Sequence, residues 1–170
     1  MYKQASNHSI YHEQRFNLLY LIKNYHPSGK SSFRRNKAEL PYSNLIIWDI
    51  AQQQQTQLFS DAVANQERIQ RLLFETNYDE QQQAIVFNHT AALLNNTAIQ
   101  PRAIKDKILI ETYHQEAETT HLWTATKQGN QLQKVATLDK CTTWHLDVGN
   151  QVIRLIKHHP TTVDITEYPW

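Results

Sequence analysis

A predicted β-hairpin over residues 43–59, SNLIIWDIAQQQQTQLF, constrains the fold of this chain more than any other stretch. An apolar segment ends at Trp48, Asp49 and Ile50, a run of glutamines follows, and residues 56–59 lead back. Alternation and turn composition of this kind indicate two antiparallel strands joined by a polar turn. The rest of the chain is expected to flank, repeat or interrupt this hairpin.

Apolar or alternating segments on both sides of the hairpin predict further strands. They cover residues 16–23, 84–88, 106–114, 120–126, 132–138, 142–148, 151–157 and 161–167. Residues 61–76 change period, because Val63, Ile69 and Leu72 fall on one side of a helix. We therefore predict a mainly β fold, an antiparallel meander with one amphipathic helix at about 61–76.

Length and composition limit the class of protein. At 170 residues the chain fits a single domain, 1–170, with residues 1–14 as a loosely held polar arm and 24–41 as a basic insert. No apolar run approaches the roughly 20 residues of a membrane-spanning helix, so no span is expected. The polar start suits a cytoplasmic protein, or a periplasmic or secreted one whose signal peptide has been removed, so the sequence leaves the compartment open.

The two halves of the chain show the same order of predicted elements. Residues 16–23 correspond to 106–114, 44–50 to 120–126, the glutamine turn to 127–130, and 56–59 to 132–138. The first copy differs by its basic insert, which replaces a short turn. Any two β-meanders share such an order, so an unrepeated meander is the alternative.

An apolar strand ending near Trp-Asp or Trp-Thr, then a polar turn and a shorter strand, resembles the outer half of a β-propeller blade. Residues 44–59 and 121–138 resemble blades of the WD-repeat and TolB types, with Trp48-Asp49 as the one motif. The resemblance implies four-stranded antiparallel sheets packed face to face. A closed ring typically needs at least four blades of about 40 residues, and this chain has room for three. We therefore expect a propeller-like stack or an open β-sandwich.

The basic insert at 24–41 holds the candidate binding residues. They combine cations with a stacking ring, which suits an anion or a single-stranded nucleic acid, and they are Lys30, Phe33, Arg34, Arg35 and Lys37. The formal net charge of the whole chain is only +1, which disfavours nucleic acid as a partner. A solvated basic loop without a ligand is the alternative.

The same insert contains NYHPSGKS, which matches the phosphate-binding pattern G-x-x-x-x-G-K-[ST] except that Asn24 replaces the first glycine. In a nucleotide site Lys30 would contact phosphate, Ser31 would bind Mg²⁺, and Asp49 would orient the metal. Against this hypothesis, the C-terminal half lacks the alternating helices that a parallel sheet needs.

The nine histidines raise a metal hypothesis. His114 and His121 flank a short loop, and His145 lies on a later strand, so three imidazoles would suit zinc if the strand order brought them together. No His-x-His or His-Glu-x-x-His spacing supports that convergence. We predict no metal and no cofactor, with the histidines as structural residues.

The sequence carries no nucleophile elbow, dinucleotide loop or calcium loop, so it gives enzyme activity no support. We expect a non-enzymatic binding domain with a protein as its partner, and a homodimer formed through sheet edges. A nucleotide- or anion-binding protein that uses the insert 24–41 is the alternative.

The aromatic residues and the single cysteine are assigned by burial. Trp48, Trp123 and Trp144 are expected in the core, and Trp170 is expected to dock against it. Cys141 is expected to be partly buried and inert, and as the only cysteine it excludes an internal disulfide framework.

Overall fold

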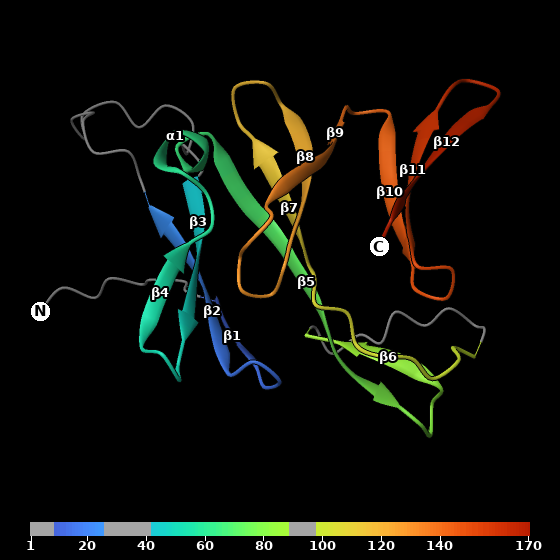
Figure 1. Cartoon of the computed structure of the whole chain (residues 1–170). Coiled ribbons are helices and arrows are strands. Elements are labelled where there is room, and N and C mark those ends of the chain that lie inside the picture. Colours follow the sequence, from blue (N-terminus) through green and yellow to red (C-terminus); the bar gives the residue numbers. More distant parts are fainter. Residues whose placement is uncertain (1–8, 26–41, 89–97) are drawn as a thin grey trace, which may run out of the picture.

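Three antiparallel β-sheets lie side by side in the computed structural model of the protein (Figure 1). The structure describes residues 9–25, 42–88 and 98–170. The sheets follow chain order, so the second lies between the first and the third (Figure 1). No helix in the described ranges is long and apolar enough to cross a membrane.

The elements are twelve strands and one short helix. Their bounds are β1 Ser9–Glu13, β2 Leu18–Tyr25, β3 Tyr42–Asp49, β4 Gln54–Gln57, α1 Asp61–Ala64, β5 Glu67–Asp79, β6 Ala84–Phe87, β7 Ile108–His114, β8 Thr119–Ala125, β9 Gln133–Leu138, β10 Thr142–Asp147, β11 Val152–His158 and β12 Val163–Pro169. Sheet 1 has the order β1-β2-β3-β4, sheet 2 has β6-β5-β7-β8-β9, and sheet 3 has β10-β11-β12. The predicted mainly β, antiparallel fold is confirmed.

The predicted helix at 61–76 is wrong beyond its first turn, because α1 ends at Ala64 and β5 follows as a central strand of sheet 2. The pairing register of β5 shifts at an irregularity between Ile69 and Arg71. Ile69 and Leu72 therefore enter the same core although they lie three positions apart, a spacing that imitates the period of a helix.

The predicted loose arm at 1–14 is also wrong in part. Ser9–Glu13 forms β1, which pairs with β2 from Ser9 opposite Ile22 to Glu13 opposite Leu18. The arm looked polar because one face of this edge strand is exposed, whereas Glu13 is buried at its end. Residues 1–8 lie outside the described ranges.

Alternation along the strands of sheet 2 builds a core on each of its faces. The core between sheets 1 and 2 includes Tyr20, Ile47, Phe74, Ile110 and Trp123. The core between sheets 2 and 3 includes Leu73, Leu109, Leu122, Leu146 and Ile153. Because successive strand residues point to opposite faces, neighbours such as Leu73 and Phe74 serve different cores, and the three sheets pack face to face.

Five hairpins share one turn geometry, in which a strand-ending side chain accepts a hydrogen bond from the main-chain N–H three residues later. The acceptors are Glu13, Asp49, Asp79, His114 and Asp147, at 2.7, 2.9, 3.0, 3.1 and 2.9 Å. The residue four positions after each acceptor has a positive φ of 48–58°: Asn17, Gln53, Gln83, Glu118 and Gln151. The glutamine runs therefore contribute to closed four-residue turns, Gln52 and Gln53 to the first and residues 81–83 to the second, while Gln54 and Gln55 already belong to β4.

Candidate functional site

A hollow of about 620 Å³ runs along the edge of β1, one of the two edge strands of sheet 1 in the described ranges. Its lining comes from β1 with the turn that follows and from the β5–β6 hairpin with the residue that follows it: Ile10, Tyr11, His12, Gln14, Thr76, Asn77, Phe87 and Asn88. Successive side chains of a strand point to opposite faces. A hollow that touches three consecutive residues of β1 therefore lies along the strand's edge and not on one face.

Hydrogen bonds within the protein hold several lining residues in place. Asn88 accepts the main-chain N–H of Phe74 at 2.9 Å and donates from its amide to the Leu72 carbonyl at 2.9 Å. The Thr76 hydroxyl donates to the Val86 carbonyl at 3.0 Å. These bonds tie the end of β6 to β5, so one wall of the hollow is fixed before any ligand arrives.

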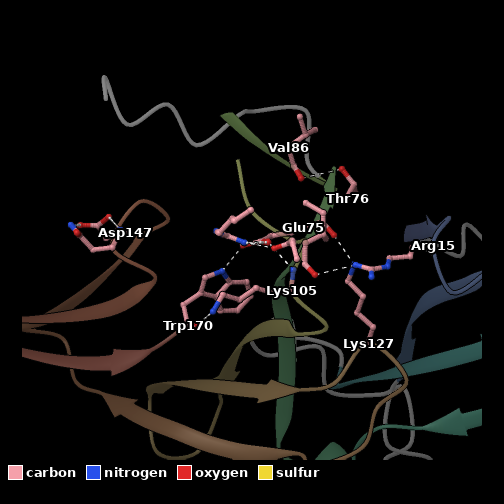
Figure 2. A network of polar contacts seen from close by, with 12 residues as sticks. Arg15, Glu75, Thr76, Val86, Lys105, Lys127, Asp147 and Trp170 are labelled. Carbon is pink, nitrogen blue, oxygen red and sulfur yellow. Dashed lines mark hydrogen bonds and ion pairs between the residues drawn. The ribbon is translucent and has the colours of Figure 1, made fainter. Parts of the chain in front are cut away.

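A buried polar network lies directly behind Thr76 and is centred on Glu75 (Figure 2). Arg102 donates two hydrogen bonds to the Glu75 carboxylate, at 2.5 and 2.8 Å. The Trp170 indole donates a third at 2.8 Å, and the main-chain N–H of Lys105 a fourth at 3.0 Å. The Lys105 ammonium also donates to the main-chain oxygen of Trp170. Sheet 2 and the C-terminal end of sheet 3 are thereby joined through one carboxylate.

Glu75 stays ionised although it is fully buried. Burial by itself raises the pKa of its carboxyl, but the bonds from Arg102, Lys105 and Trp170 outweigh that effect and the pKa falls below its ordinary value. Burial lowers the pKa of the Lys105 and Lys107 ammonium groups. Every one of these charges has a protein partner, which indicates a structural role for the network.

A second buried ion pair joins sheet 1 to sheet 2. The Lys127 ammonium donates to Glu13 at 2.9 Å and to the Glu75 carbonyl at 2.7 Å, and both side chains are at most 1% exposed. The Tyr20 hydroxyl donates to the Lys127 carbonyl at 2.8 Å. Burial, followed by the charges of Glu13 and Asp106, raises the pKa of Tyr20, so the phenol remains a hydrogen-bond donor.

A third polar cluster ties three strands of sheet 2 together. Glu67 accepts the Thr112 hydroxyl at 2.6 Å and lies 2.6 Å from the His121 Nδ1. Thr112 in turn accepts the Trp123 indole at 2.9 Å. All four side chains are buried. The acids Glu13, Glu67 and Glu75 were missed in the sequence. Glu75 directly follows the apolar run at residues 72–74 of β5, which is the available signal for a buried, paired carboxylate, whereas Glu13 and Glu67 each lie between polar neighbours.

The predicted binding residues Lys30, Phe33, Arg34, Arg35 and Lys37 lie outside the described ranges, so anion binding there stays a prediction. The magnesium role of Asp49 also stays a prediction, because Lys30 and Ser31 lie outside the described ranges. β2 and β3 are antiparallel, with Asp49 opposite Leu18 and Asn24 opposite Ser43. Six residues of strand, about 20 Å, separate Asp49 from the end of β2 where the basic insert begins.

The histidine hypothesis fails on topology. The rings of His114 and His121 are 5.5 Å apart, but His121 is bonded to Glu67. His145 lies exposed on β10, in another sheet, opposite Arg154. Within residues 9–25, 42–88 and 98–170 no three His, Cys, Asp or Glu side chains are placed to hold a metal ion.

The predictions for the four tryptophans are confirmed for two of them only. Trp123 is in the core, and Trp170, 2% exposed, is docked as expected. Trp48 and Trp144 are only half-buried, because Trp48 faces away from sheet 2 and the Trp144 indole reaches Glu111. Cys141 is exposed, contrary to the expected partial burial, since it lies in the turn before β10.

No family model, curated protein or solved structure matches this chain. The fold is a stack of three antiparallel sheets, and the candidate site is a polar hollow along one edge strand. The resemblance to propeller blades therefore stays a prediction.

Proposed function

We propose that this protein is a non-enzymatic binding domain that holds an extended segment of a protein partner along β1. The observation that carries the proposal is the course of the hollow along the edge of this strand. An edge strand has a neighbour in its own sheet on one side only, so a further strand can add on the other side. An extended peptide can add to such an edge as a further strand, with its alternate side chains entering neighbouring pockets.

The size and lining of the hollow fit this ligand. Its volume of about 620 Å³ is within the range of roughly 300–1,000 Å³ found for ligand pockets. Amide, hydroxyl and imidazole groups from Asn77, Thr76 and His12 alternate with the apolar side chains of Ile10 and Phe87. A peptide strand, which is polar along its backbone and apolar at alternate side chains, matches both kinds of surface.

The chemistry of the hollow favours binding over catalysis. Of its lining residues, only Tyr11 and His12 carry side chains that titrate. General acid–base catalysis needs a positioned donor and acceptor near the reacting group, and nucleophilic catalysis needs an activated nucleophile. The lining supplies neither a carboxylate nor a thiol.

Selection from a library of random linear peptides, displayed on phage and about ten residues long, tests the proposal. We expect the wild-type protein to enrich sequences that alternate between apolar and polar residues. The exposed Asn77 should be replaced by tryptophan, which fills the hollow without removing a core residue. Asn77→Trp should lose at least tenfold in affinity for the enriched peptides, since about 1.4 kcal/mol corresponds to tenfold.

Gln133→Trp is the matched control, because Gln133 is an exposed strand residue on β9, outside the hollow. It should bind the enriched peptides as the wild type does. A library that yields no enriched sequence, or peptides that bind Asn77→Trp and wild type equally, would contradict strand addition along β1.

A further inference from the structure

The outer face of sheet 1, turned away from sheet 2, has an apolar centre. It carries Ile10, Leu19, Leu21, Ile46 and Trp48, with the polar residues His12, Lys23, Gln55 and Gln57 beside them, and we call it face A. Cross-strand pairs place the apolar residues together: Ile10 opposite Leu21, Leu21 opposite Ile46, and Leu19 opposite Trp48. None of these five is buried, and Ile10 is 59% exposed. No element of the described ranges joins face A to either hydrophobic core.

The outer face of sheet 3 is its counterpart at the other end of the stack. It carries the apolar side chains of Val152, Ile156, Val163 and Ile165 and, between them, Arg154 with its ion-pair partners Asp147 and Glu167, and we call it face B. Ile156 lies opposite Ile165, and β12 exposes Val163 and Ile165 at 51% and 57%. The large hydrophobic side chains that the described residues expose are Ile10, Val163 and Ile165, and all three belong to face A or face B.

When positions are counted from the end of the first strand of each sheet, face A corresponds to the face of sheet 3 that packs on sheet 2. Glu13 and Asp147 are equivalent, because each ends the first strand of its sheet and accepts the turn N–H three residues later. Ile10 is three residues before Glu13, as Trp144 is before Asp147. Counted in the same way, Leu19 and Leu21 occupy the places of Ile153 and Leu155. Those are the residues with which sheet 3 packs against sheet 2: Trp144, Ile153 and Leu155.

Face B matches the opposite face by the same count. Val152 is five residues after Asp147 and Ile156 nine, as Leu18 and Ile22 are after Glu13. Leu18 and Ile22 belong to the core between sheets 1 and 2. Face B thus corresponds to the face of sheet 1 that packs on sheet 2, with the ion-paired Arg154 in the place of Tyr20, and face A corresponds to the face of sheet 3 that packs on sheet 2.

We propose that two copies of this chain close head to tail, with face B of each copy packed on face A of the other. One chain cannot join its own two faces, because sheet 2 separates them (Figure 1). A two-fold arrangement makes both contacts at once and leaves neither face open. The closed assembly has six sheets.

The area and shape of the faces suit a stable dimer. Face B, the smaller face in each contact, has three strands of six or seven residues. At about 4.8 Å between strands and 3.3 Å per residue it covers roughly 320 Å², so the two contacts bury roughly 1,300 Å² in total. Stable interfaces typically bury about 1,200–2,000 Å². Face A also holds a depression of about 350 Å³ beside Ile46, Lys23 and Gln57, which can receive the protruding side chains of face B.

Light scattering coupled to size exclusion tests the assembly on the full chain. At about 100 μM the wild type should have twice the mass of the 20.0 kDa chain. Ile165→Asp on face B and Ile10→Lys on face A should each give the mass of one chain. Both positions are exposed, so far-UV circular dichroism should show unchanged strand content. Gln133→Asp, on neither face, is the control and should stay dimeric.

Mixing the two variants separates this arrangement from other dimers. A mixed dimer keeps one wild-type contact, and at the other contact Ile165→Asp and Ile10→Lys bring opposite charges together, so the mass should return to two chains. A monomeric wild type, a dimer that survives Ile165→Asp, or assemblies larger than two chains would overturn the proposal. Ile10 also lines the hollow along β1, whereas Ile165 does not, so peptide binding by Ile165→Asp tells failure of one proposal from failure of the other.

Discussion

The side chain of Asp147 shows how a single turn residue stabilises a strand end. It accepts the main-chain N–H of Asn150 at 2.9 Å and the Asn150 amide at 2.8 Å, and it forms an ion pair with Arg154. These partners lower the pKa of Asp147 from 3.8 to about 2, the Asn150 bonds contributing most. Asp147 therefore remains ionised in the folded protein at a pH where an unfolded chain has already bound a proton.

We predict that Asp147 makes the free energy of unfolding depend on pH in the acid range. Its folded-state pKa is depressed, so its contribution is complete above pH 3.8 and is lost as the pH falls toward about 2. Asp147→Asn should lower the free energy of unfolding by about 1 to 2 kcal/mol at neutral pH, with the difference shrinking over that acid range. Urea unfolding at several pH values measures this, with the exposed Glu116→Gln as control. Parallel pH profiles for wild type and Asp147→Asn would contradict it.

The burial of a single residue was predictable where one local rule determines its environment. The docking of Trp170 follows from the large area that an indole buries. Trp48 was not predictable, because alternation along β3 tells which residues share a face but not which face is covered. The partners of Glu75 come from residues up to 95 positions away, which no local pattern reveals.

At the scale of elements, the repeated four-residue turn organises the hairpins. Its residue of positive φ is a glutamine, a glutamate or an asparagine in all five cases, although glycine adopts this conformation at less cost. The acceptor side chain at the end of the first strand compensates by holding the turn closed. The turn therefore depends more on that acceptor than on the identity of the glutamines.

We predict that the β5–β6 hairpin depends on Asp79. Its carboxylate accepts the main-chain N–H groups of Gln81 and Gln82 at 2.9 and 3.0 Å. Asp79→Ala removes both bonds and should lower the free energy of unfolding by about 1 kcal/mol, read from the shift of the urea midpoint. Glu80→Ala, an exposed change in the same turn, is the matched control and should have little effect. Equal midpoints for the two variants would show that the acceptor is dispensable.

Strands bounded by turns were predictable from composition, whereas β5 was not. Alternation identifies β10, with Trp144 and Leu146 facing the core between sheets 2 and 3. β5 is buried on both faces and carries a register shift near Ile69, so its apolar residues recur at helical spacing. A bulge of this kind depends on pairing with β7, which begins some 40 residues later in the chain.

At the scale of the whole molecule, the three sheets are held by two apolar cores and by two buried polar junctions. The sequence predicts stacked antiparallel sheets through its repeated order of elements, and it predicts neither junction. Glu13 lies in the stretch that looked like a loose arm, and Lys127 lies in a turn that looked exposed. Both are buried because the folded chain brings them together across 114 positions of sequence.

Removing one partner of a buried ion pair destabilises a protein more than removing both partners. This difference predicts how the junction of sheets 1 and 2 responds to substitution. Lys127→Met leaves the Glu13 carboxylate buried without its cation and should lower the free energy of unfolding by roughly 3 kcal/mol. Glu13→Gln combined with Lys127→Met removes both charges and should recover most of that loss, because a neutral pair leaves no buried charge unpaired. Urea unfolding of wild type, both single variants and the double variant gives the coupling free energy between Glu13 and Lys127 directly.

Lys140→Met, which breaks the exposed pair with Glu118, is the control and should change stability little. A double variant as unstable as the sum of its single variants would show that Glu13 and Lys127 act independently and that the junction is not an ion pair in its energetics.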